Sequence, residues 1–297
     1  MKALSEERVR DAYRILMPEE IPDIVVFPEI DSTNSEGKRR IYGGLERPLL
    51  LLAERQTAGR GRMGRTFDSP PGAGLYMTLC CPAGTLDGET VRVTAKAAAA
   101  AVRAIRSLTD LDLRIKWVND LYVNGRKCCG ILSETVQRAP GDAWLVVGIG
   151  INVTDRAFPD EIRDTAGSLQ APDLDRNALA AAVSRELLRE IRNLHDTSYL
   201  ALYRERSCVL GRAVVYGSPE AVAAYDAGRI PLSRNEQPGD GGPHCGYAEA
   251  IDDTGALIVR TSGGARVRLS TGDITIRVRG PLSAGRREDE SDYSEGL

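Results

Sequence analysis

The ten residues Gln56-Thr57-Ala58-Gly59-Arg60-Gly61-Arg62-Met63-Gly64-Arg65 decide between two kinds of fold. Their glycines have the G-x-G-x-x-G spacing of a dinucleotide-binding turn, which requires a helix directly after it to receive the pyrophosphate. The next segment, Thr66-Phe67-Asp68-Ser69-Pro70-Pro71-Gly72, cannot begin a helix. Asp87 and Glu89 lie about 20 residues further on, but they follow Pro82-Ala83-Gly84 rather than a strand. The sequence therefore argues against a Rossmann fold.

The same loop has the residue types of an anion-binding loop. Arg60, Arg62 and Arg65 offer planar guanidinium groups to carboxylate or phosphate, and the glycines let the backbone approach a ligand closely. Such a loop suits two anions held side by side. Two other interpretations stay open from these residues alone. One is a solvated basic turn, and the other is an RNA-binding patch, although the interleaved aromatic residues that would stack on bases are missing.

A second group of polar residues lies on a predicted hairpin. Lys116 and Asp120 belong to Lys116-Trp117-Val118-Asn119-Asp120, and Lys127 follows Asn124-Gly125, the strongest two-residue turn signal. A lysine within an apolar strand needs a partner if its ammonium group is buried. The turn would return Lys127 beside Asp120, where two ammonium groups and one acid could neutralise a pyrophosphate leaving group. The alternative is an ordinary edge-strand lysine with its ammonium group in water.

A third signal is the strand Val146-Val147-Gly148-Ile149-Gly150-Ile151-Asn152-Val153. Two glycines spaced two apart remove the side chains from one face, so that a flat ligand can lie against it. Asn152 offers a polar group at the end of the strand. A strand packed closely under a helix would explain the glycines equally well.

The remaining pattern predicts a large α+β region followed by a small β region. Apolar spacing predicts helices over 5–17, 91–107 and 178–194. Strands are predicted over 24–27, 49–54, 75–79, 113–117, 121–123, 126–132 and 143–151, and then as five short strands over 212–216, 246–251, 257–260, 265–269 and 274–278. The Pro- and Gly-containing segment 217–245 is interpreted as a loop insertion.

Composition points to a cytoplasmic protein. Of 297 residues 42% are hydrophobic, yet no stretch approaches the roughly 18 apolar residues that span a bilayer, and the charged start lacks a signal peptide. Six cysteines, four of which form two adjacent pairs, and only two histidines favour free buried thiols over disulfides or zinc. Segment 283–297 holds two arginines against five acids, which accounts for the whole net charge of −3. We expect this tail to be disordered, and a neutral body gives no basis for unspecific DNA binding.

Five segments, taken in order, resemble the motifs of biotin protein ligases. That family has S-T-N, G-R-G-R-x-G-R, K-W-P-N-D, K-x-x-G-I-L-x-E and G-x-G-I-N. In this chain they are Ser32-Thr33-Asn34, Gly59 to Arg65, Lys116 to Asp120, Lys127 to Glu134 and Gly148 to Asn152. The match is close over 25–153 and looser through 255–257 and 269–274. Val118 replaces the usual proline, and Thr66-Phe67 stands where the family often places a tryptophan against adenine.

The resemblance implies an α+β fold. It consists of a mixed-sheet catalytic domain similar to class II aminoacyl-tRNA synthetases, and a small C-terminal SH3-like β-barrel. We expect an N-terminal helical extension (1–22), the catalytic domain (23–207), the C-terminal domain (208–280, with the insertion at 217–245) and a disordered acidic tail (281–297). Because only about 20 residues precede the first core strand, we expect the ligase-only type, without the DNA-binding domain of some members.

Position by position, the resemblance also implies site residues. The catalytic candidates are Lys127, Asp120, Arg60 and Arg62. The residues expected around biotin are Ser32, Thr33, Asn34, Gln56, Gly59, Arg60, Gly61, Arg62, Lys127 and Gly130. The residues expected around ATP are Arg65, Phe67, Lys116, Asn119, Lys127 and Asn152. No metal ligands are expected from the protein, because Mg²⁺ would be carried in mainly by the phosphates of ATP.

The implied activity is that of a biotin–[biotin carboxyl-carrier protein] ligase. Biotin would be activated with ATP to biotinyl-5′-AMP, with release of pyrophosphate, and transferred to a lysine of the biotin carboxyl carrier domain of a biotin-dependent carboxylase. We expect no DNA and no membrane as partners, and a homodimer stays open. The alternatives are a lipoate protein ligase, which shares the fold and the adenylation logic, and a nonenzymatic RNA-binding protein that uses the Arg/Gly loop.

Overall fold

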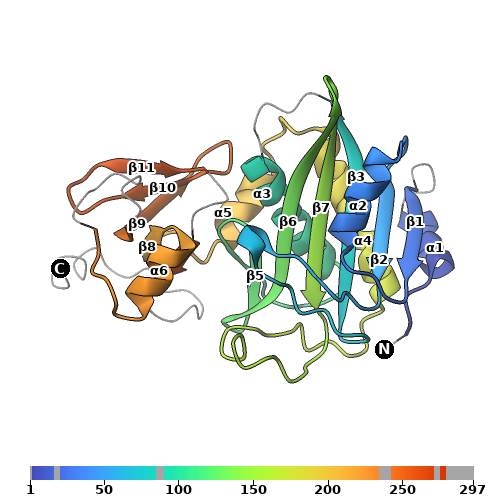
Figure 1. Cartoon of the computed structure of the whole chain (residues 1–297), viewed down its shortest axis with the longest axis horizontal. Helices are drawn as coiled ribbons and strands as arrows, with labels where there is room; N and C mark the ends of the chain where they lie inside the picture. Colours follow the sequence, from blue (N-terminus) through green and yellow to red (C-terminus); the bar gives the residue numbers. More distant parts are fainter. Residues whose placement is uncertain (1, 17–20, 85–89, 234–241, 271–274, 279–297) are drawn as a thin grey trace.

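Seven strands between residues 23 and 152 form one mixed sheet with the order β1-β2-β3-β7-β6-β5-β4 (Figure 1). The structure is a computed structural model and describes residues 2–16, 21–84, 90–233, 242–270 and 275–278. β1 and β2 are parallel, and the other neighbours in this sheet are antiparallel. The mixed sheet expected from the sequence is confirmed. Its strands are β1 (Asp23–Phe27), β2 (Leu49–Ala53), β3 (Gly74–Gly84), β4 (Arg114–Lys116), β5 (Asp120–Val123), β6 (Arg126–Ala139) and β7 (Asp142–Asn152).

Helices cover both faces of this sheet. α3 (Thr90–Arg106) and α4 (Arg176–Arg192) pack together on one face, α1 (Glu6–Leu16) packs on α4, and α2 (Thr33–Tyr42) lies on the other face against β2, β3 and β7 (Figure 1). On β2, Leu50 and Leu52 enter the large core, whereas Leu49 and Leu51 enter a smaller core with Ile41 of α2. Successive side chains of a strand point to opposite faces, so a strand covered on both sides needs the continuous apolar run that β2 has.

Two helices of the larger domain were not predicted from the sequence. α2 begins at the S-T-N segment, where Ser32 is the N-cap and accepts a hydrogen bond from the backbone N–H of Ser35 at 3.5 Å. Its sequence holds few apolar residues and a glycine, so it lacks helical periodicity. α5 (Tyr199–Arg206) is short and has no clear apolar face, yet Tyr199 and Tyr203 are buried in the core. Tertiary packing, not local propensity, decides both helices.

The predicted hairpin is confirmed, and it connects the segment that contains Lys116 to the segment that contains Lys127. β5 and β6 are antiparallel, and the turn between them consists of Asn124 and Gly125 at φ values of 50° and 74°. Both positions of such a turn need positive φ, which is why Asn-Gly predicts it.

Residues after 208 form a separate five-stranded antiparallel sheet with the order β11-β10-β9-β8-β12, beside the larger domain (Figure 1). The small C-terminal β domain predicted from the sequence is therefore confirmed. Its strands are β8 (Ala213–Gly217), β9 (His244–Ile251), β10 (Leu257–Arg260), β11 (Arg266–Leu269) and β12 (Thr275–Val278). The predicted tail 281–297 lies outside the described residues.

The reading of 217–245 as a loop throughout is wrong, because the segment contains helix α6 (Pro219–Asp226). Ser218 is the N-cap and accepts a hydrogen bond from the backbone N–H of Ala221 at 3.1 Å, and Pro219 takes the first turn. Proline at the first helical position is favourable rather than disruptive, so the proline that suggested a loop in fact helps to begin a helix.

All six cysteines are free thiols, as predicted. Four of them are buried, and burial raises the pKa of Cys80 and of Cys128 to about 12. Thiols of this kind are unreactive at neutral pH. Among the described helices, none is long and apolar enough to cross a membrane.

A buried ion-pair network joins α3 to α4 and yields a stability prediction. Lys96, which is 0% exposed, donates to Glu190 Oε2 at 3.0 Å and to the carbonyl oxygen of Asn193 at 3.1 Å, and Glu190 also pairs with Arg103. Lys96→Met is expected to lower the free energy of unfolding by about 3 to 5 kcal/mol, because it leaves a buried carboxylate short of a partner. Urea denaturation measures this. The matched control is Lys2→Met, which removes an exposed pair with Asp175 and should cost less than about 1 kcal/mol. Equal losses in the two variants would contradict the prediction.

Candidate functional site

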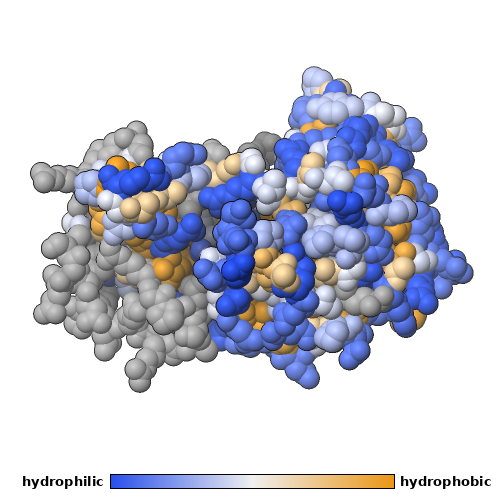
Figure 2. Space-filling view, turned by 60° about the horizontal axis from the view of Figure 1, so that its bottom comes forward, coloured by the Kyte–Doolittle hydropathy of each residue, from blue (hydrophilic) through white to orange (hydrophobic). Residues whose placement is uncertain are grey.

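One cavity of about 650 Å³ brings together almost all of the predicted site residues. Its lining mixes cationic with apolar side chains, such as Met77, Ile131 and Ile149. Figure 2, in which the lower side of Figure 1 comes forward, shows small apolar areas within a mainly hydrophilic surface. The predicted residues in the lining are Ser32, Thr33, Asn34, Gln56, Arg60, Gly61, Arg62, Arg65, Phe67, Lys116, Asn119, Asp120, Lys127, Gly130 and Asn152.

Gly59 is the predicted residue that does not line the cavity. A side chain there would collide with the carbonyl oxygen of Phe67 and lie 2.8 Å from Ser69 Oγ. The backbone N–H of Phe67 donates to the carbonyl oxygen of Gly59 at 2.9 Å. Gly59 is therefore needed where the two arms of the Arg/Gly loop meet, and the loop closes because no Cβ is present.

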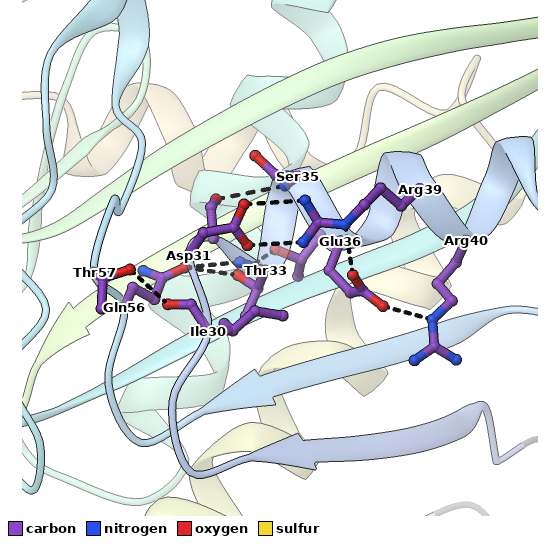
Figure 3. Close-up of polar contacts among 11 residues, drawn as sticks. Ile30, Asp31, Thr33, Ser35, Glu36, Arg39, Arg40, Gln56 and Thr57 are labelled. Carbon is purple, nitrogen blue, oxygen red and sulfur yellow. Dashed lines mark hydrogen bonds and ion pairs between the residues drawn. The ribbon is translucent and has the colours of Figure 1, made fainter.

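The start of α2 forms a neutral polar wall of the cavity (Figure 3). Gln56 Oε1 accepts from the backbone N–H of Thr33 at 2.9 Å and from its hydroxyl at 3.1 Å. Gln56 Nε2 donates to Ser69 Oγ at 2.9 Å. Gln56 thus ties α2 to the segment after the Arg/Gly loop, so a shift of either would move the other.

Charged residues hold the same helix from the solvent side (Figure 3). Arg39 donates to both carboxylate oxygens of Asp31, at 3.0 and 2.8 Å, and its Nε donates to Glu36. These hydrogen bonds from Arg39 lower the pKa of Asp31. The helix that carries Ser32, Thr33 and Asn34 is therefore anchored at its first two turns.

The face of β7 that was expected to admit a flat ligand lines the cavity, and two protein side chains approach it closely. A Cβ on Gly148 would overlap Asn34 Oδ1, and a Cβ on Gly150 would lie 2.5 Å from the Phe67 ring. A Cβ on Gly130 of the neighbouring strand would be 3.2 Å from the same ring. The glycines thus make room for Asn34 and Phe67, and these two side chains line the cavity together with the glycines.

The cationic wall is built by the Arg/Gly loop and the hairpin. Arg62 Nη1 donates to Asn119 Oδ1 at 2.7 Å, and Lys127 Nζ lies 2.6 Å from Asp120 Oδ1, as the hairpin predicted. Lys116 pairs with Asp120 across β4 and β5 in register. Burial lowers the pKa of Lys116, and the nearby Asp120 opposes that shift. Two lysines therefore lie near one carboxylate.

Asn152 has an unused acceptor at the end of β7. Its Nδ2 donates to the carbonyl oxygen of Gly167 at 2.9 Å, and its buried Oδ1 has no hydrogen-bond partner among the described residues. A buried polar atom without a partner is costly. A ligand N–H group at this end of the cavity would supply the missing donor.

Two arginines of the cavity wall were missed by sequence reasoning. Arg156 lies beyond β7, and its Nη1 donates to Asp68 Oδ2 at 2.5 Å. Arg277 is on β12 of the C-terminal domain, where its Nε donates to Asp226 Oδ2 at 3.0 Å. Neither belongs to a motif, and no local pattern places a strand of the second domain beside the cavity of the first.

The packing of Asn34 on Gly148 predicts a strong effect of one methyl group. Gly148→Ala is expected to lower the free energy of unfolding by about 1 to 3 kcal/mol, because the Cβ overlaps a side chain that is itself hydrogen-bonded. Denaturant titration measures this. In an Asn34→Ala background the same change should cost much less. If the cost is the same in both backgrounds, the overlap with Asn34 is not its cause.

Comparison with known proteins supports one family for both domains. Residues 26–152 match the Biotin/lipoate A/B protein ligase family, and residues 240–277 match the Biotin protein ligase C terminal domain. A biotin–[acetyl-CoA-carboxylase] ligase of Mycobacterium tuberculosis is 31% identical over 261 residues, which are 84% of this chain and 87% of that protein. The bifunctional ligase/repressor BirA of Bacillus spizizenii is 28% identical over 250 residues.

The extent of the matches differs between these relatives. The BirA alignment covers 83% of this chain and 72% of that protein, and three further BirA proteins are matched over 57 to 66% of their length.

Among solved structures, a biotin protein ligase from Aquifex aeolicus in complex with biotin and ATP has a TM-score of 0.68 at 24% identity. It covers 86% of this chain and 99% of that one, so the two-domain fold is shared.

Proposed function

This chain belongs to the biotin protein ligase family, and from that premise we propose that it activates biotin with ATP and transfers it to a lysine of a biotin carboxyl carrier domain. The observation that carries the proposal is the division of one cavity into two walls. Thr33 and Gln56 form a neutral hydrogen-bonding wall, and Arg62, Lys116 and Lys127 contribute to a cationic one. An uncharged ring with a carboxylate tail, placed beside a polyphosphate, has this complementarity.

The first step brings two anions together. The carboxylate of biotin attacks the α-phosphorus of ATP, which forms the mixed anhydride biotinyl-5′-AMP and releases pyrophosphate. Fixed cations offset the repulsion between the reactants and stabilise the charge that develops. Lys127 and Arg62 are the residues to which we assign this role at the reacting atoms. Arg65, Lys116 and Asn119 would hold the phosphates, and Phe67 and Asn152 would hold the base.

Magnesium would enter with the nucleotide. Among the described residues no group of three or more His, Cys, Asp or Glu could hold a metal ion on its own. The ion is mainly bound by phosphate oxygens in sites of this kind, and when bound it neutralises part of the phosphate charge. Asp120 is an acid of the same cavity, 2.6 Å from Lys127 and in register with Lys116 on the neighbouring strand.

In the second step a carrier lysine attacks the acyl carbon, and AMP leaves. We assign Asp120 to orient or deprotonate the incoming amine. Its Oδ1 lies 2.6 Å from Lys127 Nζ, so the two groups that we assign to the reacting atoms are neighbours. The adenylate must meanwhile be kept from water, for which the Arg/Gly loop beside the cavity is the natural device.

An assay of pyrophosphate release with biotin or with lipoate distinguishes a biotin ligase from a lipoate ligase. The full chain is incubated with ATP, Mg²⁺ and one acid, and acyl transfer to a carrier domain is followed in parallel. Release and transfer with biotin but not with lipoate are the expected result. Activity with lipoate alone would support a lipoate ligase, and release with neither acid would contradict the adenylation proposal.

A further inference from the structure

Asn34 was assigned to biotin by resemblance, but its polar atoms are used within the protein. Its Oδ1 accepts from the hydroxyl of Thr78 at 2.6 Å, and its Nδ2 donates to Glu134 Oε2 at 3.0 Å and to the carbonyl oxygen of Leu132 at 3.4 Å. The side chain is almost fully buried. An amide has two N–H donors and one acceptor oxygen, so little hydrogen-bonding capacity is left for a ligand.

Its two side-chain partners, Thr78 and Glu134, are not part of the cavity lining. Thr78 of β3 is 0% exposed, and its hydroxyl also lies 2.7 Å from the hydroxyl of Thr33. Glu134 of β6 accepts from Lys38 Nζ at 2.6 Å, and its Oε1 lies 3.3 Å from Arg60 Nη2. Through these contacts Thr78 reaches the neutral wall of the cavity, and Glu134 reaches the Arg/Gly loop.

We propose that Thr78, Asn34 and Glu134 form a brace that positions Thr33 and Arg60 for biotin. The proposal rests on the function proposed above. These three are positioning residues, since none of them needs to touch the ligand by a hydrogen bond. A satisfied buried network allows one arrangement of its members, and a binding site needs its groups held to within about 0.5 Å. Gly148 contributes by leaving the space in which Asn34 lies.

The brace is tested by isosteric removal of one hydroxyl. Biotin and ATP are titrated separately into the full chain by calorimetry. Thr78→Val is expected to raise the Kd for biotin by about 2- to 13-fold, the loss of one hydrogen bond, with the Kd for ATP within twofold of wild type. Thr78→Ser, which restores the hydroxyl, is expected to restore biotin affinity. The control is Thr94→Val, a buried threonine on α3 that donates only to its own helix, and it should alter neither affinity.

Three results would overturn the brace. They are unchanged biotin affinity in Thr78→Val, an equal loss of biotin and ATP affinity, and no recovery in Thr78→Ser. If Thr78→Val does not fold, Glu134→Gln takes its place, because it keeps an acceptor for Asn34 but loses the charge beside Arg60. It should show the same selective loss of biotin affinity, and wild-type affinity in it would overturn the brace. A wild-type chain that binds no biotin would instead contradict the proposed function.

Discussion

Lys127→Ala is expected to reduce pyrophosphate release with biotin and ATP to the background level, at least about 100- to 1000-fold below wild type. The ammonium group lies 2.6 Å from Asp120 and beside Gly130, where a Cβ would come within 3.3 Å of Nζ. It therefore lines the cavity in a defined position, and in the proposed reaction it would lie where the carboxylate of biotin and the α-phosphate of ATP meet. Its removal takes away the cation and leaves Asp120, an anion, facing two anionic substrates.

The measurement is initial-rate pyrophosphate release, with the far-ultraviolet circular dichroism spectrum and the melting temperature as controls for folding. Lys127 is about one third exposed, so the variant should fold normally. Lys127→Met keeps most of the aliphatic stem and should be as inactive as the alanine variant. Near-wild-type release by either folded variant would show that Lys127 has no catalytic role.

The Arg62→Gly variant is expected to form biotinyl-5′-AMP but to release it into solution. Loss of one charge-assisted contact is worth about 1.5 to 3 kcal/mol, which corresponds to roughly 10- to 150-fold faster release. Arg62 is bonded to Asn119, a residue expected beside ATP, and it lies in the loop that borders the cavity. The change should therefore weaken retention of biotinyl-5′-AMP more than its formation.

Free adenylate acylates exposed amines, so the variant should biotinylate bystander proteins that lack a carrier domain. Labelling of albumin in the presence of biotin and ATP measures this. The control variant is Arg266→Gly, which breaks an exposed pair with Glu249 away from the cavity and should label only the carrier. If Arg62→Gly also labels only the carrier, Arg62 does not take part in retention.

Much of the fold could be predicted because its patterns are local. The leucine run at 49–53 matches a strand covered on both faces, the alanine-rich segment matches α3, and Asn124-Gly125 matches the turn that sets Lys127 beside Asp120. Elements that depend on distant contacts were missed. α2 has little helical periodicity and is held by Gln56, Thr78 and Glu134, which come from three other parts of the chain.

The site also has features that follow from local sequence motifs and features that depend on distant contacts. The motif residues could be grouped into one site from their order, and all of the predicted site residues except Gly59 line one cavity. The contacts that each side chain makes inside the site could not be predicted from the motifs. Gly148 and Gly150 line the cavity, but the close approach of Asn34 and Phe67 to them was not predicted. Gly59 closes the loop instead of lining the cavity. Both differences follow from contacts between segments far apart in the sequence.

The C-terminal sheet supplies Ile276, Arg277 and Val278 to the cavity wall, opposite residues of the catalytic domain. A molecule that fills the cavity therefore contacts two domains at once, and its binding free energy is shared with the interface between them. By linkage, a ligand that contacts both domains is expected to stabilise their docked arrangement. The same relation acts in reverse: anything that loosens the docking lowers the apparent affinity, even if it touches no residue of the wall. The affinity for a ligand in the cavity and the stability of domain docking are thus expected to be thermodynamically coupled.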